Sequence, residues 1–575
     1  VNLPNSILKI NGSVGSDGQV LTSTGSAVAW EDAGGGGASA LNGLTDVISN
    51  ITNFTDSILI SPDGAAPPHG TLSSATDNVG IGKDAFAALT SGDYNIAIGS
   101  NSLNDLTTGG SNVAIGGWGA LEKVTTQSGN VAIGSSAGRY ITNGGNNTFV
   151  GTNAGTGNSG GVAASSNVGI GQDVMYAING VANNNVGIGK YALRDGLTTG
   201  DDNIAIGESA GRNISTASEL IVIGTEAGYT LSTQSDNIAI GPYAMKLATG
   251  GWNIAIGNSA LEDATGNTNM GIGFHAGQQI SSGTNNLAIG YQALDGATTE
   301  SHNIAIGVDA LGGAVNGGEK NIAIGNYSLD ALTSSDQTVA IGHETGTAIT
   351  TGSWNTAVGD SSMKSMSSGY KNTSLGYQSL KAQTGNSSVA IGAESLRGSG
   401  TGGQNTAVGA TAGYAMTNGT NNIMLGFSAG NNITTGNSNV VIGAADVTAD
   451  ADDQLSISSG DGSPVWITGD SNGNVSLNQL ADVVAVSSNT TLTQAQSGSY
   501  VYWTAGSCTL PADAAVGTQF TIFNNTGSSA TVALGSGDAM AGSWASNAAV
   551  ADNDATAYVC VNISSSESQW VQVGA

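Results

Sequence analysis

A triplet of apolar, small and apolar residues recurs along most of the chain, with asparagine before it and glycine after it. Between residues 78 and 443 there are 22 copies, and their closing glycines, from Gly82 to Gly443, are about 17 residues apart. Three copies are Asn95-Ile96-Ala97-Ile98-Gly99, Asn203-Ile204-Ala205-Ile206-Gly207 and Asn303-Ile304-Ala305-Ile306-Gly307. Because alternate residues of a strand share a face, each triplet predicts a short strand whose two flanking residues, mostly Ile or Val, lie together.

The leading asparagine and the closing glycine each have a physical interpretation. Glycine suits a turn that needs a positive φ. Stacked copies would align the asparagines into a ladder of side-chain amides. This ladder is interrupted only where the leading residue is Leu220, Thr338 or Ser388.

The middle residue of the triplet is small in all but four copies. The exceptions are Phe149, Val222, Met424 and Val441. Alanine is a poor strand former, so we expect its face to lie close to another backbone. The strand would then be buried on both faces, between the core of its own coil and a neighbouring chain. The alternative is an ordinary half-exposed face lined by alanine.

The remainder of each unit is also patterned. Three residues after the closing glycine comes Ala or Ser, followed by a large residue such as Leu193 or by glycine such as Gly211. In the glycine version an apolar residue follows three positions later, as Ile214 does, so both versions are expected to fill similar core volume. Acidic residues fall between the core positions and should decorate the rim: Asp105, Glu122, Asp195, Glu226, Asp263 and Glu394.

A unit of this length is too short for a helical pair or a propeller blade. It predicts one turn of a parallel β-solenoid, or β-roll, with two short strands per coil and about 4.8 Å of rise. About 22 coils would make a rod of about 100 Å. Since one thin coil encloses little core, we expect several copies of the chain to associate.

The sequence divides into five segments. They are a small β or attachment element (1–33), a glycine-rich linker and connector (34–77), the solenoid (78–447), a second connector (448–478) and a C-terminal β-sandwich-like domain (479–575). Strands of the last domain are expected at 500–503, 519–523 and 557–561. A longer unit between Gly151 and Gly171 should protrude as a loop at 155–161.

Composition narrows the possible functions. The chain has 89 Gly, 13 basic and 42 acidic residues, for a net charge of −29. A basic nucleic-acid-binding patch is therefore not expected, and an anionic membrane surface would repel the chain. No apolar run reaches the roughly eighteen residues of a membrane span, and residues 1–10 do not read as a signal peptide. Two cysteines, Cys508 and Cys560, make no disulfide framework; they either pair or remain two buried thiols.

Residues that could carry chemistry do not form a convincing site. His69, His275, His302 and His343 do not align into a metal or catalytic row. The carboxylates Asp201-Asp202 and those of Asp450, Asp452 and Asp453 are better explained as solvated turns than as a glycosidase pair. The turn from Asp470 to Asn474 has a calcium-like order of oxygen ligands but lacks the downstream glutamate. We therefore predict no catalytic, cofactor or metal site and no enzyme activity.

The Asn-Ile-Ala-Ile-Gly units resemble the head repeats of YadA-like trimeric autotransporter adhesins, and similar repeats are found in phage tail fibres. The resemblance covers about 365 of the 575 residues. It implies a parallel β-roll, three chains side by side, and a role in attachment. The unit here is a few residues longer than that of the adhesins, which leaves the turns unassigned.

The flanking segments favour the phage version of this resemblance. Residues 15–21, 30–32 and 466–475 resemble segments of phage structural proteins, and 570–575 lack the aromatic girdle of a membrane barrel. We therefore expect a homotrimeric virion fibre, on a tail or another external appendage. It would act as a rigid spacer, bind other virion structural proteins and attach to a host-surface glycan or protein. The alternatives are a glycan-degrading tailspike, and a cellular trimeric adhesin or extracellular filament.

Overall fold

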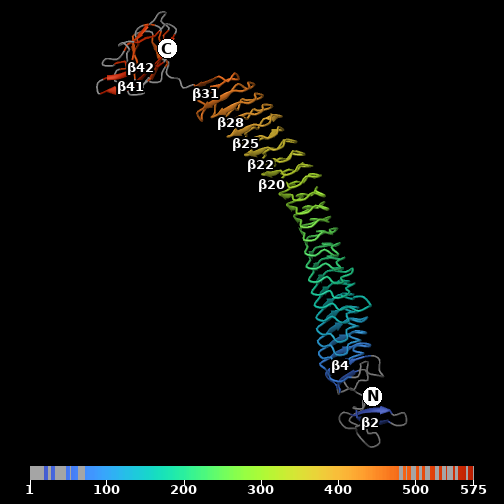
Figure 1. Ribbon diagram of the computed structural model, residues 1–575. Helices are drawn as coiled ribbons and strands as arrows, with labels where there is room; N and C mark the ends of the chain where they lie inside the picture. The colour runs from blue at the N-terminus through green and yellow to red at the C-terminus, as the bar shows by residue number, and fades with distance from the viewer. Residues whose placement is uncertain are drawn as a thin grey trace, which may run out of the picture. The chain divides into compact units, whose positions relative to one another are not determined.

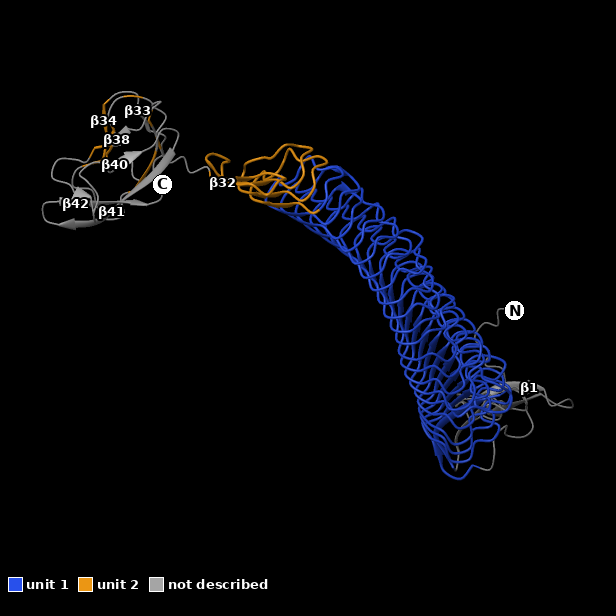
Figure 2. Ribbon diagram, turned by 45° about the horizontal axis from the view of Figure 1, so that its top comes forward, with its two compact units in different colours: residues 1–420 blue, residues 421–575 orange. Residues whose placement is uncertain are grey.

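The computed structural model divides the chain into two compact units, Val1–Thr420 and Asn421–Ala575 (Figure 2). Residues 53–61 and 72–477 are described without a gap. The other described segments are 19–23, 28–32, 47–51, 484–486, 489–493, 500–503, 505, 508–511, 519–524, 530–533, 539–540, 548–550, 554–564 and 567–573. Residues 34–46 and 62–71 of the predicted linker and connector lie outside the described residues.

One ladder of parallel strands dominates unit 1. β4 (Phe54–Ile60) pairs in parallel with β6 (Val79–Ile81), and β6 pairs in the same way with β7 (Ile96–Ile98). Later strands repeat this register, so equivalent residues of successive repeats lie side by side (Figure 1). These strands are β8 (Val113–Ile115), β9 (Val131–Ile133), β10 (Thr148–Val150), β11 (Val168–Ile170), β12 (Val186–Ile188), β13 (Ile204–Ile206), β14 (Ile221–Ile223), β15 (Ile238–Ile240), β16 (Ile254–Ile256), β17 (Met270–Ile272), β18 (Leu287–Ile289), β19 (Ile304–Ile306), β20 (Ile322–Ile324), β21 (Val339–Ile341), β22 (Thr356–Val358), β23 (Thr373–Leu375), β25 (Val389–Ile391) and β27 (Thr406–Val408). The protein is thus an all-β parallel β-solenoid of about 25 turns.

Each coil has one regular strand of three residues, so the prediction of two strands per coil was wrong. Additional pairing in the described repeats is short: β5 (Ala75–Thr76) joins β4, and β24 (Ala382–Gln383) joins β26 (Ser399–Gly400). A single bridge also links Ile141 and Val162. The rest of each coil consists of turns, because it contains left-handed residues that a strand cannot accommodate.

These left-handed residues form the corners of the coil. After Gly189 they are Tyr191, Leu193 and Asp202, with φ of 64°, 52° and 59°. We number the positions of a coil from its closing glycine, so that position 1 is the residue directly after it. The left-handed residues occupy position 2, position 4 and the position before the next leading asparagine. Most other coils have left-handed residues at the same positions. The chain therefore turns at the same points in each coil, which returns the next triplet to the side of the previous one.

The middle residue of the triplet points into the coil, and the flanking residues point outward. Ala97 is fully buried, whereas Ile96 and Ile98 are partly exposed. The predicted contact between alanine and a neighbouring chain was therefore wrong, because alanine faces the interior of its own coil. The interior is narrow: a Cβ added to the middle residue Gly187 would lie 3.5 Å from Cδ1 of Leu193, a position-4 side chain on the opposite wall.

Core volume is shared between neighbouring positions, as the two versions of the repeat predicted. Where position 4 is Gly211, a Cβ there would lie 2.6 Å from Cδ1 of Ile214, so the isoleucine fills the space that leucine fills elsewhere. Large middle residues follow the same rule. A Cβ on Gly155 would lie 2.4 Å from Phe149. Phe149 therefore occupies volume that the glycines at position 4 leave free.

The predicted asparagine ladder is confirmed. The backbone N–H of Asn112 donates to Oδ1 of Asn95 at 3.0 Å, and its Nδ2 donates to the same oxygen at 3.1 Å and to the carbonyl of Gln127 at 2.9 Å. A second ladder joins the threonine turns, where Oγ1 of Thr107 donates to the carbonyl of Thr125 at 2.9 Å. Both ladders bond each coil to the next and satisfy polar groups that stacking buries.

Antiparallel strands lie at the N-terminal end of the unit 1 ladder. β3 (Val47–Ile51) pairs antiparallel with β4. Before them, β1 (Gln19–Ser23) and β2 (Val28–Asp32) form an antiparallel pair within the predicted small β element. Of the loop predicted at 155–161 in unit 1, residues 158–160 are exposed as expected, whereas Gly155 and Thr156 are buried, so the exposed part is shorter than predicted. An antiparallel strand at the end of a parallel ladder limits further stacking on that edge.

Unit 2 begins with the final coils. β28 (Ile423–Leu425), β29 (Val440–Ile442) and β30 (Leu455–Ser458) pair in parallel. β31 (Val465–Gly469) and β32 (Val475–Leu477) then add antiparallel strands. The parallel ladder of unit 2 thus also ends on a change of direction.

The C-terminal part of unit 2 is a mixed sheet. Its order is β33 (Val484–Val486), β35 (Tyr500–Trp503), β37 (Gln519–Asn524), β41 (Asp554–Ser564), β42 (Glu567–Val573) and β39 (Ala539–Met540). The short pairs are β34 (Thr490–Thr491) with β36 (Cys508–Thr509), and β38 (Ala530–Val532) with β40 (Ala548–Val550). Trp503 and Phe520 are buried, so these two aromatic residues belong to its core. The three strands predicted here are present.

Candidate self-association surface

The outward residues of the triplets form two rows along unit 1. In β15 and β16, Ile238 lies beside Ile254 and Ile240 beside Ile256. All flanking positions from β6 to β27 are apolar except Thr148, Thr356, Thr373 and Thr406. We call these rows the stripe.

No part of the chain that the structure describes covers the stripe. Ile133 and Ile170 are each 40% exposed, which is high for residues whose sides are covered by strands about 4.8 Å above and below. If about a third of each side chain is exposed, the stripe of unit 1 presents apolar area on the order of 2,000 Å². Monomeric soluble proteins rarely expose a continuous apolar patch above a few hundred Å². An exposed apolar surface of this extent is typical of an interface with another molecule.

Aromatic side chains border the stripe just after the strands end. Phe274 and Tyr291 are each the first residue after a closing glycine. Their rings stack with centroids 5.4 Å apart and an angle of 7° between the ring planes. His275 covers Phe274 at 3.8 Å. Both Phe274 and Tyr291 are more than 40% exposed. The border widens the apolar surface, and aromatic residues are typical of protein interfaces.

Basic residues concentrate at position 5 of the coil. Seven of the chain's 13 basic residues occupy it: Arg139, Arg194, Arg212, Lys246, Lys364, Lys381 and Arg397. Several pair with a carboxylate of the preceding coil, as Arg139 does with Glu122 at 2.7 Å and Lys246 with Glu226 at 2.7 Å. Acidic residues lie between the core positions, as predicted. The ion pairs link these acidic residues to basic residues of the next coil. Sequence reasoning missed this column, although assigning each basic residue a position in the repeat would have found it.

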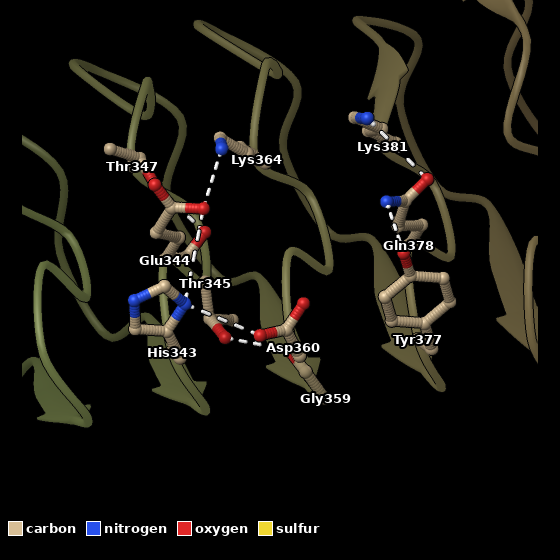
Figure 3. Close-up of polar contacts among 10 residues, drawn as sticks. All are labelled: His343, Glu344, Thr345, Thr347, Gly359, Asp360, Lys364, Tyr377, Gln378 and Lys381. Atoms are coloured by element: carbon tan, nitrogen blue, oxygen red, sulfur yellow. Dashed lines mark hydrogen bonds and ion pairs between the residues drawn. The ribbon is translucent and has the colours of Figure 1, made fainter.

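Figure 3 shows one such group of contacts across successive coils. Lys364 Nζ lies 2.5 Å from Oε2 of Glu344, and Nδ1 of His343 lies 3.3 Å from Oδ2 of Asp360. The hydrogen bond from Lys364 lowers the pKa of Glu344. These side chains are between 33% and 53% exposed, so their contribution to stability is small. We interpret the column as inter-coil contacts rather than as a ligand site.

Among the described residues, the histidines and aspartates considered above as catalytic or metal-binding residues do not come together in one site. His275, His302 and His343 lie in different coils, and His69 is outside the described residues. Oδ1 of Asp450 accepts hydrogen bonds from the hydroxyls of Thr434 and Thr435, which lower its pKa. Within the described part of the chain, no three His, Cys, Asp or Glu residues are placed to hold a metal ion.

The calcium-like turn is closed by its own hydrogen bonds. Nδ2 of Asn474 donates to Oδ2 of Asp470 at 2.9 Å, and the backbone N–H groups of Asn472 and Asn474 donate to Oδ1 at 3.0 Å. The bond from the Asn474 side chain is the main cause that lowers the pKa of Asp470. The carboxylate therefore acts as the acceptor of an Asx turn.

The fold defines a long β-solenoid protein. No protein-family model matches the chain, and no curated protein or solved structure matches it significantly. Among the described residues, none belongs to a helix that could cross a lipid bilayer.

Proposed function

We propose that the chain is a homotrimeric structural fibre in which the stripes of three copies face one another. The observation that carries this proposal is the row of outward, mostly Ile and Val residues that continues along unit 1 with only four threonines in it. Three stripes around one axis would remove this surface from water and close the assembly. The number three comes from the resemblance of the triplets to the adhesin heads.

Within such a trimer, the solenoid acts as a rigid spacer. The Asn112-to-Asn95 bonds and their equivalents tie each coil to the next, so bending must deform many contacts together. We further propose that the fibre is an external appendage of a virion, fixed to other virion proteins and attached to a host-surface glycan or protein. The resemblance of the repeats and of segments 15–21 and 466–475 to phage fibres supports this placement.

The C-terminal sheet is proposed to fold as a β-sandwich-like domain. Val501 and Ile522 are register partners in β35 and β37, and both are buried. Trp503 and Phe520 are two residues away from Val501 and Ile522 in the same strands, so they share their face of the sheet, and they are buried too. A sheet with one such apolar face requires a second layer to cover it.

The self-association proposal is tested by the mass of the full chain in solution. We expect about three times 56.5 kDa by light scattering. A sixfold variant with glutamate on alternate coils of the stripe should lose the trimer, because each glutamate would be buried without a partner. The substitutions are Ile98→Glu, Ile133→Glu, Ile170→Glu, Ile206→Glu, Ile240→Glu and Ile272→Glu.

The matched control adds the same charge on the exposed threonine turns. Its substitutions are Thr108→Glu, Thr126→Glu, Thr199→Glu, Thr216→Glu, Thr233→Glu and Thr265→Glu. We expect this control to remain trimeric. A stable wild-type monomer, or equal dissociation of both variants, would reject the stripe as the interface.

The virion placement has its own test. Antibodies against the solenoid should label an external fibre on intact particles in electron micrographs. Labelling of a cell surface instead would favour the cellular adhesin. Release of reducing sugar from host-envelope glycans by the purified fibre would favour the glycan-degrading tailspike.

A further inference from the structure

Position 7 of the coil is a core position, and one coil places an amide there. Leu106, Ile214 and Leu332 occupy it in other coils and are fully buried. After Gly376 it is occupied by Gln383, which is only 1% exposed and whose Nε2 and Oε1 have no hydrogen-bond partner among the described residues. A buried amide without partners is costly, because it loses its bonds to water and gains none.

The next coil does not compensate for this amide. Its position 7 is Ser399, which is exposed. The register of β24 and β26 places Gln383 opposite Gly400, which has no side chain to pack against it. The core is therefore thin as well as polar at this point.

Hydroxyl groups replace alanine in the same part of the core. Position 3 carries a buried hydroxyl in five successive coils, at Ser328, Thr345, Ser362, Ser379 and Ser395, and the last three of these lie near the buried middle residue Ser374 or follow it. Oγ of Ser362 lies 2.6 Å from Oγ of Ser374, which also donates to the carbonyl of Ser379 at 3.0 Å. These hydroxyls are satisfied, but each such bond adds little net stability.

The outer contacts weaken over the same coils. Ser388 interrupts the asparagine ladder. The backbone N–H of Asn405 donates to Oγ of Ser388 at 3.3 Å, whereas in the regular ladder the N–H of Asn112 donates to Oδ1 of Asn95 at 3.0 Å. On the stripe, Thr373 and Thr406 replace apolar residues. Core, ladder and stripe are thus independently weaker in one short region.

We propose that residues 359–409 are a built-in joint, at which the solenoid opens locally and bends before the coils on either side do. In a repeat array each coil contacts only its neighbours, so one weak coil divides the array into two cooperative blocks. The joint does not depend on the proposed trimer, because Gln383 is buried inside a single chain.

Hydrogen exchange of the full chain, read by mass spectrometry, tests the joint. Peptides within 376–400 should exchange at least about tenfold faster than peptides within 207–231, which belong to coils with an apolar core. Gln383→Leu restores an apolar residue at position 7 and should remove most of this difference. Gln404→Leu, the same substitution at an exposed site in the joint, is the control and should leave exchange unchanged.

A second measurement concerns bending. In electron micrographs of the wild-type fibre, bends should cluster at the joint, and Gln383→Leu should spread or abolish them. Equal protection of 376–400 and 207–231 in the wild type would overturn the proposal. So would fast exchange that persists in Gln383→Leu, or a Gln383→Leu chain that fails to fold, because either would show that the amide is not the source of the weakness.

Discussion

Asn203 donates both its backbone N–H and its side-chain Nδ2 to Oδ1 of Asn185, at 3.0 and 2.9 Å. Its own Oδ1 accepts the N–H of Leu220 at 3.1 Å, and its Nδ2 also donates to the carbonyl of Ala217. One fully buried side chain thus satisfies groups in three coils.

Asn203→Ala should therefore destabilise the solenoid by about 2–4 kcal/mol, because it leaves several buried polar groups without a partner. The free energy of unfolding from urea titration measures the change. Asn158→Ala, in the exposed loop at 158–160, is the control and should change it by less than about 0.5 kcal/mol. A loss for Asn203→Ala as small as that of the control would contradict the ladder's importance.

The closing glycines should tolerate no side chain. Gly207 has a φ of 134°, and a Cβ there would lie 2.6 Å from the carbonyl oxygen of Gly224 in the next coil. Gly207→Ala combines backbone strain with this clash, so we expect a loss of several kcal/mol or failure to fold. Gly160→Ala is the control, since a Cβ there meets nothing within 4 Å. The midpoint of thermal unfolding should fall sharply for the first variant and stay within a few degrees for the second.

Glu300 should make stability depend on pH. Burial raises the pKa of its carboxyl, but N–H bonds from Gly317, Thr298 and Thr299 outweigh burial and hold the pKa below its ordinary value of 4.5. A lowered folded-state pKa means that ionised Glu300 stabilises the fold above the unfolded pKa, and that this stability is lost as pH falls through the folded pKa.

Glu300→Gln should accordingly cost about 1–3 kcal/mol at pH 7 and much less at pH 3. Free energies of unfolding of both proteins, measured across this range, provide the test. A difference that stays constant with pH would show that the carboxylate charge is unimportant.

Cys508 should be unreactive while the chain is folded. It is a buried free cysteine, and burial raises the pKa of its thiol to about 12. Because the thiolate is the reactive form, alkylation at pH 8 should be slow until the chain unfolds. Measuring the reaction in Cys560→Ser isolates Cys508, because the Cys560 side chain is not among those described. Rapid labelling of the native variant would mean that the C-terminal sheet opens readily.

The period, the asparagine ladder and the glycine turns could be predicted from sequence, because a residue that recurs at one place in a stack meets its own copies. The sequence could not show which face of the triplet is buried inside the coil. Alternation shows that Ile96 and Ile98 share a face, but a small Ala97 suits either a narrow coil interior or a neighbouring chain. The opposite wall, contributed by position-4 residues such as Leu193, decides between them, and that wall is visible only in the fold.

The second predicted strand failed for a related reason. Leucine is common in extended and helical segments, so nothing in the residue type marks Leu193 as left-handed. Similarly, the position-5 column is dispersed along the sequence, and only stacking brings Arg139 and Glu122 together.

The sharing of core volume limits how such a protein can grow or shrink. A coil whose interior is filled by its own leucine could be duplicated or deleted without altering its neighbours. Phe149, by contrast, also reaches the following coil, where a Cβ added to Gly169 would lie 2.9 Å from its ring. Removing either one alone would create a void or a collision. Changes in fibre length should therefore be tolerated in steps of one coil in some regions and of two coils in others.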